Sequence, residues 1–297
     1  MKPIPVNEPP RDDAAPAPFV NRRISLPRGS VLTVAGSDSG GGAGIQGDIK
    51  TITLLGSYAS SVITCLTAQN SLGVNATFAP PIDFFSEQLR TVLSDIPVDV
   101  IKTGMLYSAE IIRALTEALQ LFDTKILVID PVMTAKGGWE LLECDARTAM
   151  VQELLPRCWL ITPNIPESEQ LTGMQVTDEQ TMIAAAFRLQ EMGARNVLIK
   201  GGHMTGDECV DILLAGETVS RFAERRIDHG NTHGTGCTYA SAISALLAQG
   251  MALPDAVFRA KLFVTAAIRH ALPMGAGHGP LNHFRAAQIF SAGMGDG

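Results

Sequence analysis

The chain has 297 residues, a formal net charge of −7 and an isoelectric point near 5.4. This length can form one large α/β domain with a substantial core, and the acidic charge argues against non-specific nucleic-acid binding. Five scattered cysteines with no CxxC pair predict neither a disulfide framework nor a zinc site, and favour a reducing cytoplasm. Because no apolar run approaches about 18 residues, we expect no membrane span.

The predicted elements begin after a polar, proline-rich stretch at residues 1–29, which we expect to be a disordered leader. In chain order, the expected strands are 31–35, 60–66, 98–102, 126–129, 158–161, 196–200, 209–214 and 218–222, and the expected helices are 45–55, 83–94, 108–122, 177–192, 238–249 and 254–271. Short apolar strands that alternate with helices predict a mostly parallel sheet covered on both faces. The last two strands predict an antiparallel hairpin. We therefore predict a single domain over residues 30–285 and a tail at 286–297.

The first glycine-rich loop contains Gly42-Ala43-Gly44-Ile45-Gln46-Gly47, which literally matches GxGxxG. A dinucleotide site needs its first glycine directly after the strand and an acidic residue about 20 residues later. Here the match begins six residues after Gly36, and no Asp or Glu occurs between Asp48 and Asp83. We therefore reject a dinucleotide site, although spacing alone does not exclude a plain flexible loop.

A second glycine-rich turn, within residues 228–237, comes immediately before an apolar helix. Unpaired backbone N–H groups and the positive end of the helix dipole make such a turn a binding site for phosphate. The same dipole lowers the pKa of a thiol in the first helical turn, so Cys237 is expected to be an accessible thiolate. An anion site with a potential base beside it predicts phosphoryl transfer.

Several ordered motifs carry a family resemblance: Ala35-Gly36-Ser37-Asp38, Gly41-Gly42-Ala43-Gly44-Ile45-Gln46 with Asp48, Thr67-Ala68-Gln69-Asn70, Lys102-Thr103-Gly104-Met105, Asp130-Pro131-Val132-Met133, Thr162-Pro163-Asn164 with Glu167, His233-Gly234-Thr235-Gly236-Cys237, and the closing stretch 277–284. Over about residues 31–284 the chain resembles the hydroxymethylpyrimidine/phosphomethylpyrimidine kinases of thiamine biosynthesis, in the ribokinase-like superfamily. The resemblance implies a three-layer αβα fold. It also implies ATP- and Mg²⁺-dependent phosphorylation of 4-amino-5-hydroxymethyl-2-methylpyrimidine and of its monophosphate, and a homodimer.

The nucleotide and metal residues are expected at the ends of buried strands. Asp130 and Glu167 are the predicted Mg²⁺ carboxylates, as the superfamily pattern implies, although each alone could be a loop cap. Lys200 is predicted to reach the nucleotide phosphates, and Asn164 belongs to the same nucleotide site. Lys261 is a weaker candidate for nucleotide contact, since a lysine on an amphipathic helix is ordinarily solvated.

The acceptor pocket is expected around the first glycine loop. Gln69 offers a donor and an acceptor, and the carboxylate of Asp48 can accept from an exocyclic amine, so together they suit an aminopyrimidine ring. Gly36 allows close approach of the backbone. The resemblance implies Met105 and Val132 as apolar walls, with ordinary core packing as the alternative.

Cys237 is the candidate proton acceptor for the hydroxymethyl group, and the amides of Gly234, Thr235, Gly236 and Cys237 are expected to stabilise phosphate charge. The alternative is a small buried thiol. His233 has no second ligand at metal spacing and is expected to pack within its loop. Lys136, in a predicted flap at 133–138, could cover the phosphates.

Two other functions stay open. A pyridoxal kinase of the same superfamily also acts on a hydroxymethyl heteroaromatic ring, although Gln69 favours the aminopyrimidine. A non-catalytic pyrimidine-binding module would predict gaps in the set formed by Asp130, Glu167, Lys200 and Cys237, and all four are present.

Overall fold

The structure is a computed structural model that describes residues 27–122, 126–134, 144–227 and 230–292. Most of the predicted leader, the end of the predicted tail and Lys136 lie outside these residues. Within the described ranges, no helix is long and apolar enough to cross a membrane.

The described strands form one nine-stranded sheet in the order β3-β2-β1-β4-β5-β6-β7-β8-β9. The strands are β1 (Ser30–Asp38), β2 (Tyr58–Asn70), β3 (Gly73–Phe78), β4 (Val100–Thr103), β5 (Ile126–Ile129), β6 (Leu160–Ile161), β7 (Asn196–Ile199), β8 (Glu208–Ala215) and β9 (Thr218–Arg225). The six adjacent strands β2, β1, β4, β5, β6 and β7 are parallel to one another. The edge strands pair antiparallel, β3 with β2 at one edge and β8 with β7 and β9 at the other. The predicted hairpin is therefore confirmed as β8 and β9.

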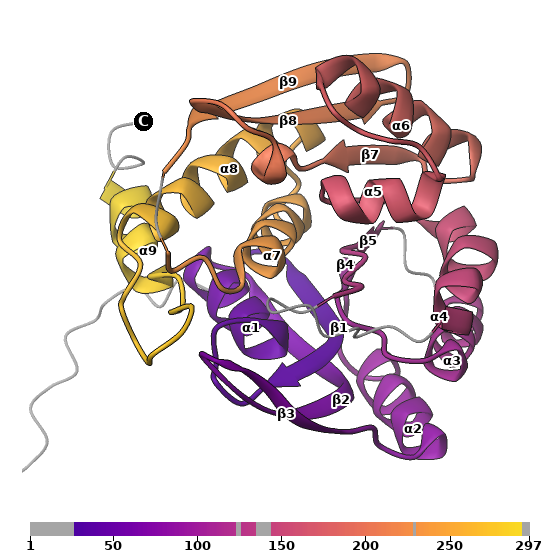
Figure 1. Cartoon of the computed structure of the whole chain (residues 1–297). Coiled ribbons are helices and arrows are strands. Elements are labelled where there is room, and N and C mark those ends of the chain that lie inside the picture. Colours follow the sequence, from indigo (N-terminus) through magenta and orange to yellow (C-terminus); the bar gives the residue numbers. More distant parts are fainter. Residues whose placement is uncertain (1–26, 123–125, 135–143, 228–229, 293–297) are drawn as a thin grey trace, which may run out of the picture.

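Helices cover both faces of this sheet, as Figure 1 shows. They are α1 (Gly44–Leu54), α2 (Ile82–Leu93), α3 (Ala109–Leu121), α4 (Cys144–Ala149), α5 (Ile165–Thr172), α6 (Glu179–Glu191), α7 (Thr235–Ala248), α8 (Leu253–Arg269) and α9 (His283–Ala292), with short π and 3₁₀ turns at Met150–Leu154, Leu155–Arg157 and Gly201–His203. Helices α1, α7, α8 and α9 pack on one face, and α2 to α6 pack on the other. The predicted three-layer αβα class is confirmed.

Side-chain alternation along the strands explains the two layers. On β5, Leu127 and Ile129 join one apolar cluster, whereas Val128 joins the cluster on the opposite face. Successive side chains of a strand point to opposite faces, and both faces here are covered. A central strand must therefore be apolar at every position, which is why these segments appear as continuous apolar runs in the sequence.

Several sequence-based boundaries were wrong. Strand β2 runs four residues past the predicted end at 66 and pairs with the unpredicted β3, where Leu66 opposite Phe78 is 45% exposed, so no buried alternation marked this extension. Helix α9 crosses the predicted domain boundary at 285. Ala286 (0% exposed) and Ala287 (8% exposed) pack into the core, so most of the predicted tail belongs to the domain. Helices α4 and α5 are short and were also missed.

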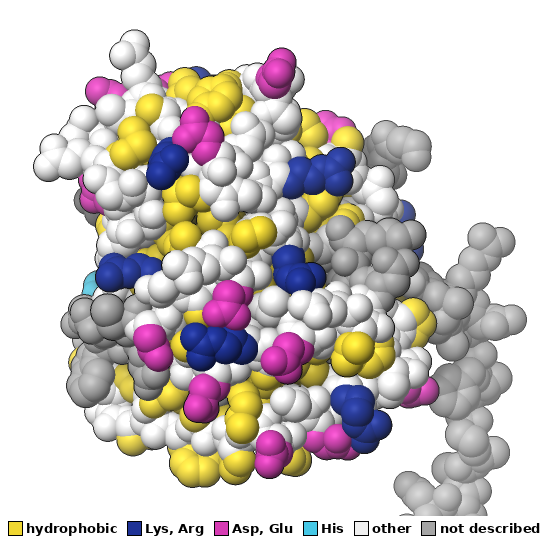
Figure 2. Space-filling view, turned by 90° about the vertical axis from the view of Figure 1, so that its right-hand side faces the viewer, with side chains coloured by type: hydrophobic (Ala, Val, Ile, Leu, Met, Phe, Trp, Pro, Cys, Tyr) yellow, Lys and Arg dark blue, Asp and Glu magenta, His cyan; other side chains and the backbone are white. Residues whose placement is uncertain are grey.

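The surface in Figure 2 carries Lys and Arg side chains interspersed with Asp and Glu side chains. On the described part of this face, neither sign of charge forms one continuous patch. The arrangement of greatest interest lies instead at the edge of the sheet. Because β1, β4, β5, β6 and β7 are parallel, their carboxyl ends meet at one edge, which is where ligands bind in open α/β sheets.

Candidate active site

A cavity of about 680 Å³ lies at this carboxyl edge. Its lining includes every predicted site residue in the described part of the chain except Asp48. These residues are Gly36, Gln69, Met105, Asp130, Val132, Asn164, Glu167, Lys200, Gly234, Thr235, Gly236, Cys237 and Lys261. The fold therefore gathers into one cavity residues that are as far apart in the chain as β1 and α8.

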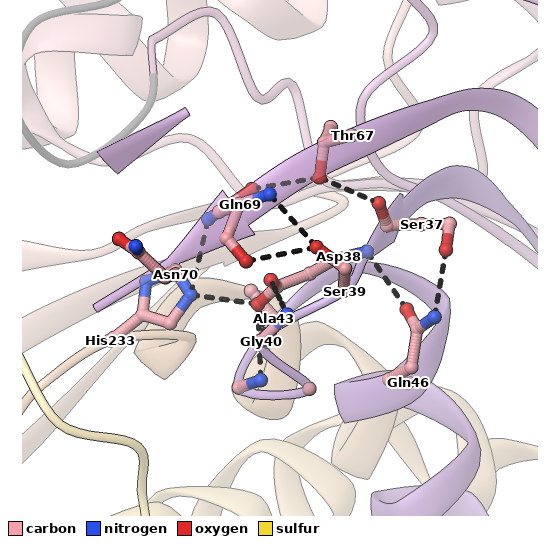
Figure 3. A network of polar contacts seen from close by, with 12 residues as sticks. Ser37, Asp38, Ser39, Gly40, Ala43, Gln46, Thr67, Gln69, Asn70 and His233 are labelled. Carbon is pink, nitrogen blue, oxygen red and sulfur yellow. Dashed lines mark hydrogen bonds and ion pairs between the residues drawn. The ribbon is translucent and has the colours of Figure 1, made fainter. Parts of the chain in front are cut away.

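One carboxylate, Asp38 at the end of β1, organises the first glycine loop (Figure 3). Its Oδ1 accepts a hydrogen bond from the Gly40 amide at 2.8 Å, and its Oδ2 accepts from the Gly42 and Ala43 amides at 3.0 and 2.9 Å. The same Oδ2 lies 2.9 Å from Nε2 of His233 in the second glycine turn. Burial raises the pKa of Asp38, but the bonds from His233 and the loop amides outweigh it, so the net pKa is lowered.

The two glycine loops approach each other so closely that side chains are excluded at the contact. Gly234 has φ +84°, and a Cβ there would lie 1.9 Å from the carbonyl oxygen of Gly42. A Cβ on Gly36 would lie 2.4 Å from Cε of Met105, which places this pair together on one cavity wall. Glycine is thus required at Gly234 for both its φ and its contact.

The predicted anion site forms the start of α7. This helix begins at Thr235, three residues before the predicted start at 238, so Thr235, Gly236 and Cys237 all belong to its first turn. The first N–H groups of an α-helix have no acceptor within the helix, and they lie at the positive end of its dipole. Because these residues line the cavity, the helix start can bind an anionic group there.

Gln69, near the end of β2, also lines the cavity. Its Oε1 accepts from Thr67 Oγ1 at 3.2 Å, and its Nε2 lies 3.4 Å from Nε2 of His233 (Figure 3). Met105, which is 7% exposed, and Val132 contribute apolar surface. An amide beside apolar walls suits a flat heteroaromatic ring with polar substituents.

The cavity lining also contains a buried charged cluster. Lys200, directly after β7, donates from Nζ to Oδ1 of Asp130 at 2.8 Å, and Asp130 is 1% exposed. Oδ2 of Asp130 is buried and has no hydrogen-bond partner. A Cβ on Gly236 would lie 3.3 Å from Nζ of Lys200 and 3.6 Å from Asp130 Oδ2, so this cluster adjoins the start of α7.

Asn164 and Glu167 form a capping box at the start of α5. The Asn164 side chain accepts from the Glu167 amide at 2.9 Å, and Glu167 Oε2 accepts from the Asn164 amide at 2.8 Å. Burial raises the pKa of Glu167 to about 7, with Lys200 lowering it and Asp130 raising it further. Both predicted residues therefore face the cavity, and both already have a structural role in the helix cap.

These carboxylates fit a magnesium ion. Mg²⁺ in phosphoryl-transfer sites is held by one or two carboxylates together with water and substrate phosphates. The unpartnered Oδ2 of Asp130 and the neighbouring Glu167 supply such a partial set. Within the described residues, no three His, Cys, Asp or Glu side chains are grouped to hold a metal on their own. A metal site built here would need phosphate oxygens to complete it.

Lys261 of α8 also lines the cavity, but its ammonium group is engaged. Its Nζ donates to Oδ2 of Asp211 on β8 at 2.6 Å, and Asp211 Oδ1 accepts from the Gly201 amide at 3.0 Å. Lys261 and Asp211 are 6% and 2% exposed. Sequence reasoning missed Asp211, because an aspartate within a hairpin strand gives no signal of an internal ion pair.

The prediction that Asp48 contacts the substrate is wrong in this structure. Asp48 is 0% exposed and lies outside the cavity lining, where both its oxygens are 2.9 Å from Nζ of Lys102 on β4. Thr33 and Ser241 donate to it at 2.6 and 2.7 Å. Since α1 begins at Gly44, Asp48 falls one turn inside the helix and faces the sheet. Lys102 was missed because a buried lysine resembles a solvated one in sequence.

The expected lowering of the Cys237 pKa is also wrong. The thiol does lie in the first turn of α7, but burial raises the pKa of Cys237 to about 11, against the opposing effect of the Lys102 ammonium group. Desolvation of the charged form outweighs the helix dipole here. Cys237 is therefore a neutral thiol at neutral pH.

Comparisons with known proteins show which family the chain resembles. The phosphomethylpyrimidine kinase family model matches residues 38–282. The chain is 57% identical over 268 residues to the thiamine biosynthesis bifunctional protein ThiED of Geobacter sulfurreducens, covering 90% of this chain and 55% of that protein, so it spans about half of that relative. It is 46% identical over 263 residues to the hydroxymethylpyrimidine/phosphomethylpyrimidine kinase of Haemophilus influenzae, covering 87% of this chain and 98% of the relative.

Solved structures share the fold. The pyridoxal kinase of Staphylococcus aureus in complex with AMP-PCP and pyridoxal has a TM-score of 0.82 at 35% identity, covering 89% of this chain and 96% of that one. The phosphomethylpyrimidine kinase of Clostridium difficile has a TM-score of 0.73 at 40% identity, covering 80% and 99%. The αβα architecture is thus that of small-molecule kinases.

Proposed function

Because the chain belongs to the phosphomethylpyrimidine kinase family, we propose that it uses ATP to phosphorylate 4-amino-5-hydroxymethyl-2-methylpyrimidine and then the resulting monophosphate. The observation that carries this proposal is the single cavity at the sheet edge. Its acceptor side holds Gln69 and Met105, its charged side holds Asp130 and Lys200, and the start of α7 lies beside both sides. Phosphoryl transfer needs a pocket for the acceptor, carboxylates for a metal ion, and cationic or amide groups for the phosphates, and this cavity offers each of them.

On the nucleotide side, the Lys200 ammonium group already donates to Asp130. Its remaining N–H groups would donate to phosphate oxygens. Asp130 and Glu167 would hold Mg²⁺, which neutralises charge on the phosphates when it is bound. Lys261 is placed to contribute a second positive charge beside Asp211. The amides at the start of α7 would bind the transferred phosphoryl group, because they are fixed donors at the positive end of the helix.

On the acceptor side, Gln69 would hydrogen-bond the aminopyrimidine, and Gly36 and Met105 would bound its ring. Cys237 lies where it could accept the proton of the hydroxymethyl group. With a thiol pKa of about 11, the thiolate is a minor species at neutral pH. If Cys237 acts as the base, it must therefore act from a small thiolate population, and activity should rise with pH.

The direct test is a substrate panel with ATP and Mg²⁺, in which phosphorylation of the hydroxymethylpyrimidine, its monophosphate and pyridoxal is followed by steady-state kinetics. We expect the highest kcat/KM for the two pyrimidines. Asp130→Asn is the matched variant, because it keeps the side-chain shape but removes the charge. Tight pyrimidine binding without ATP turnover would instead support a non-catalytic binding module.

Pyridoxal kinase is the second candidate, and a specific observation favours it. Two solved pyridoxal kinases, from Bacillus subtilis and S. aureus, reach TM-scores of 0.80 and 0.82 at 36% and 35% identity. A higher kcat/KM for pyridoxal than for the pyrimidines would establish that reading. Gln69→Leu separates the two, since loss of its hydrogen bond should reduce kcat/KM for the aminopyrimidine by about 10- to 100-fold and for pyridoxal much less.

Two further parts of the proposal concern the cellular setting. We place the protein in the cytoplasm, where its scattered cysteines would stay reduced. The homodimer implied by the resemblance remains a prediction. Sedimentation velocity on the full chain tests it, and a monomer at micromolar concentration would contradict it.

A further inference from the structure

A fully buried ion pair lies beneath the cavity. Lys102 on β4 and Asp48 on α1 both have side chains that are 0% exposed, and Thr33 and Ser241 donate to the Asp48 carboxylate. None of these four side chains lines the cavity. Two buried charges are costly unless each is paired and fully hydrogen-bonded. The position of this cluster relative to the reacting groups suggests what its charges do.

The cluster lies one helical turn from Cys237 along α7, which packs against α1 and β4 and lies beside α1 in Figure 1. Cys237 lies in the first turn of α7 at the cavity, and Gly44, which begins α1, lines the same cavity. Four residues further along both helices, Ser241 Oγ donates to Asp48 at 2.7 Å. Residues four apart lie on the same face of a helix, about 5.4 Å along its axis. Cys237 therefore lies about one helical turn from Ser241 and from the ion pair that Ser241 contacts.

Four charged groups act on the Cys237 thiol. Burial has the largest effect and raises the pKa of Cys237, and Lys102 is the strongest group that lowers it. Asp48 and Asp130 raise this pKa, and Lys200 interacts with the same sulfur from the other side of the site. Lys102 thus lowers the pKa of Cys237, whereas the two carboxylates raise it. Asp48, which pairs with Lys102, therefore cancels part of the effect of Lys102 on this pKa.

We propose that Lys102 is an electrostatic partner of Cys237: its buried ammonium group, held by Asp48, stabilises negative charge on the Cys237 sulfur when the thiol loses its proton to solvent. Lys102 acts through Cys237 and touches no substrate, so it is a positioning residue. The use of this charge in turnover rests on the proposed kinase function. The charge relationship itself is a property of the free protein and can be measured without substrate.

The test is the rate at which iodoacetamide alkylates Cys237 in the full-length protein between pH 7 and pH 10, read from the Cys237 peptide by mass spectrometry. The reaction forms an S–C bond and releases iodide, and only the thiolate reacts. At a pH below the pKa of the Cys237 thiol, each unit of change in that pKa alters the alkylation rate about tenfold. Cys237→Ser identifies the peptide signal, and Lys50→Met is the control, because Lys50 is an exposed lysine of the same helix α1.

The two charged residues predict changes of opposite sign. Lys102→Met should slow alkylation at pH 8 by about tenfold or more, Asp48→Asn should accelerate it by about threefold or more, and Lys50→Met should leave it unchanged. The double variant Lys102→Met/Asp48→Asn leaves no unpaired buried charge, so it keeps the test available if Lys102→Met does not fold. It should be slower than wild type and faster than Lys102→Met. An unchanged or slower rate in Asp48→Asn, or a double variant as fast as wild type, would overturn the proposal.

Turnover separates this inference from the proposed function. If the alkylation rates shift as expected and kcat of the double variant falls in proportion, Lys102 supports catalysis through Cys237. If the alkylation rates shift while kcat stays at the wild-type value, the electrostatic relationship stands and the role of Cys237 as the catalytic base is contradicted.

Discussion

Asp38 and His233 are 195 residues apart in the chain, and their side chains meet at 2.9 Å between Oδ2 and Nε2. The contact joins the loop after β1 to the turn that begins α7. Because Gln69 lies 3.4 Å from the same ring nitrogen, the end of β2 is connected to the turn before α7 through one histidine. The two glycine-rich motifs thus form one structural unit.

The first prediction concerns Asp38→Asn. The lowered pKa of Asp38 means that its charged form stabilises the fold at pH values above about 3.8, and that this contribution is lost as the pH falls through the folded-state pKa. The variant should lower the free energy of unfolding by about 1–3 kcal/mol at pH 7. Urea denaturation should show this difference shrinking between pH 5 and pH 3. A difference that stays constant with pH would contradict the assignment. Glu87→Gln, in an exposed pair with Arg90, is the control and should change little.

The second prediction compares Gly234→Ala with Gly56→Ala. Both glycines have positive φ, +84° and +89°, but only Gly234 has an atom within 4 Å of the added Cβ, which would lie 1.9 Å from Gly42 O. Gly56→Ala should cost about 1–2 kcal/mol from backbone strain alone. Gly234→Ala should cost more and should also reduce kcat, because the two loops must separate. If thermal or urea unfolding shows the same loss of stability for Gly234→Ala as for Gly56→Ala, the contact between the two loops adds nothing to the effect of the substitution.

The third prediction concerns the thiol. If Cys237 is the proton acceptor, Cys237→Ala should reduce kcat by a factor of about 10² or more. Since its pKa is about 11, wild-type kcat should increase with pH through the range 7 to 9, as the thiolate fraction grows. Cys237→Ser tests the alternative, because a hydroxyl keeps the size and hydrogen bonding of the site. Wild-type activity in Cys237→Ala, or a flat pH profile, would leave Cys237 with a packing role.

The fourth prediction concerns Glu167→Gln. Because the folded protein raises the pKa of Glu167 to about 7, it binds this proton more tightly than the unfolded chain, whose value is near 4.5. The stabilisation from the protonated form is complete below about pH 4.5 and is lost as the pH rises through about 7. Glutamine does not titrate and can still close the capping box. The variant should therefore gain stability relative to wild type between pH 5 and pH 8 in urea denaturation. A difference that moves in the opposite direction would contradict the assignment.

The sequence was a good guide where one local pattern determined the outcome. The alternation of short apolar runs with helices predicted the covered parallel sheet. Strand-end positions indicated Asp130 and Lys200 as candidate site residues, and both line the cavity. It was a poor guide at the periphery. The end of β2 and β3 are largely exposed, so they lack the buried alternation on which strand predictions depend. Helix α9 does bury His283, Ala286 and Ala287 at helical spacing, but it is short and was predicted to be a tail.

By itself, the sequence determined most of the order of elements, because apolar periodicity is a property of local sequence. The motifs that resemble a known family, together with the polar residues that follow strands, indicated the residues that line the cavity at the carboxyl edge. Only the tertiary structure decided which charges would pair. In the folded protein, Asp48 pairs with Lys102 outside the cavity, and Asp38 contacts His233. Burial there raises the pKa of Cys237. These outcomes depend on desolvation and on neighbours that are distant in the chain, so no local pattern of residues could reveal them.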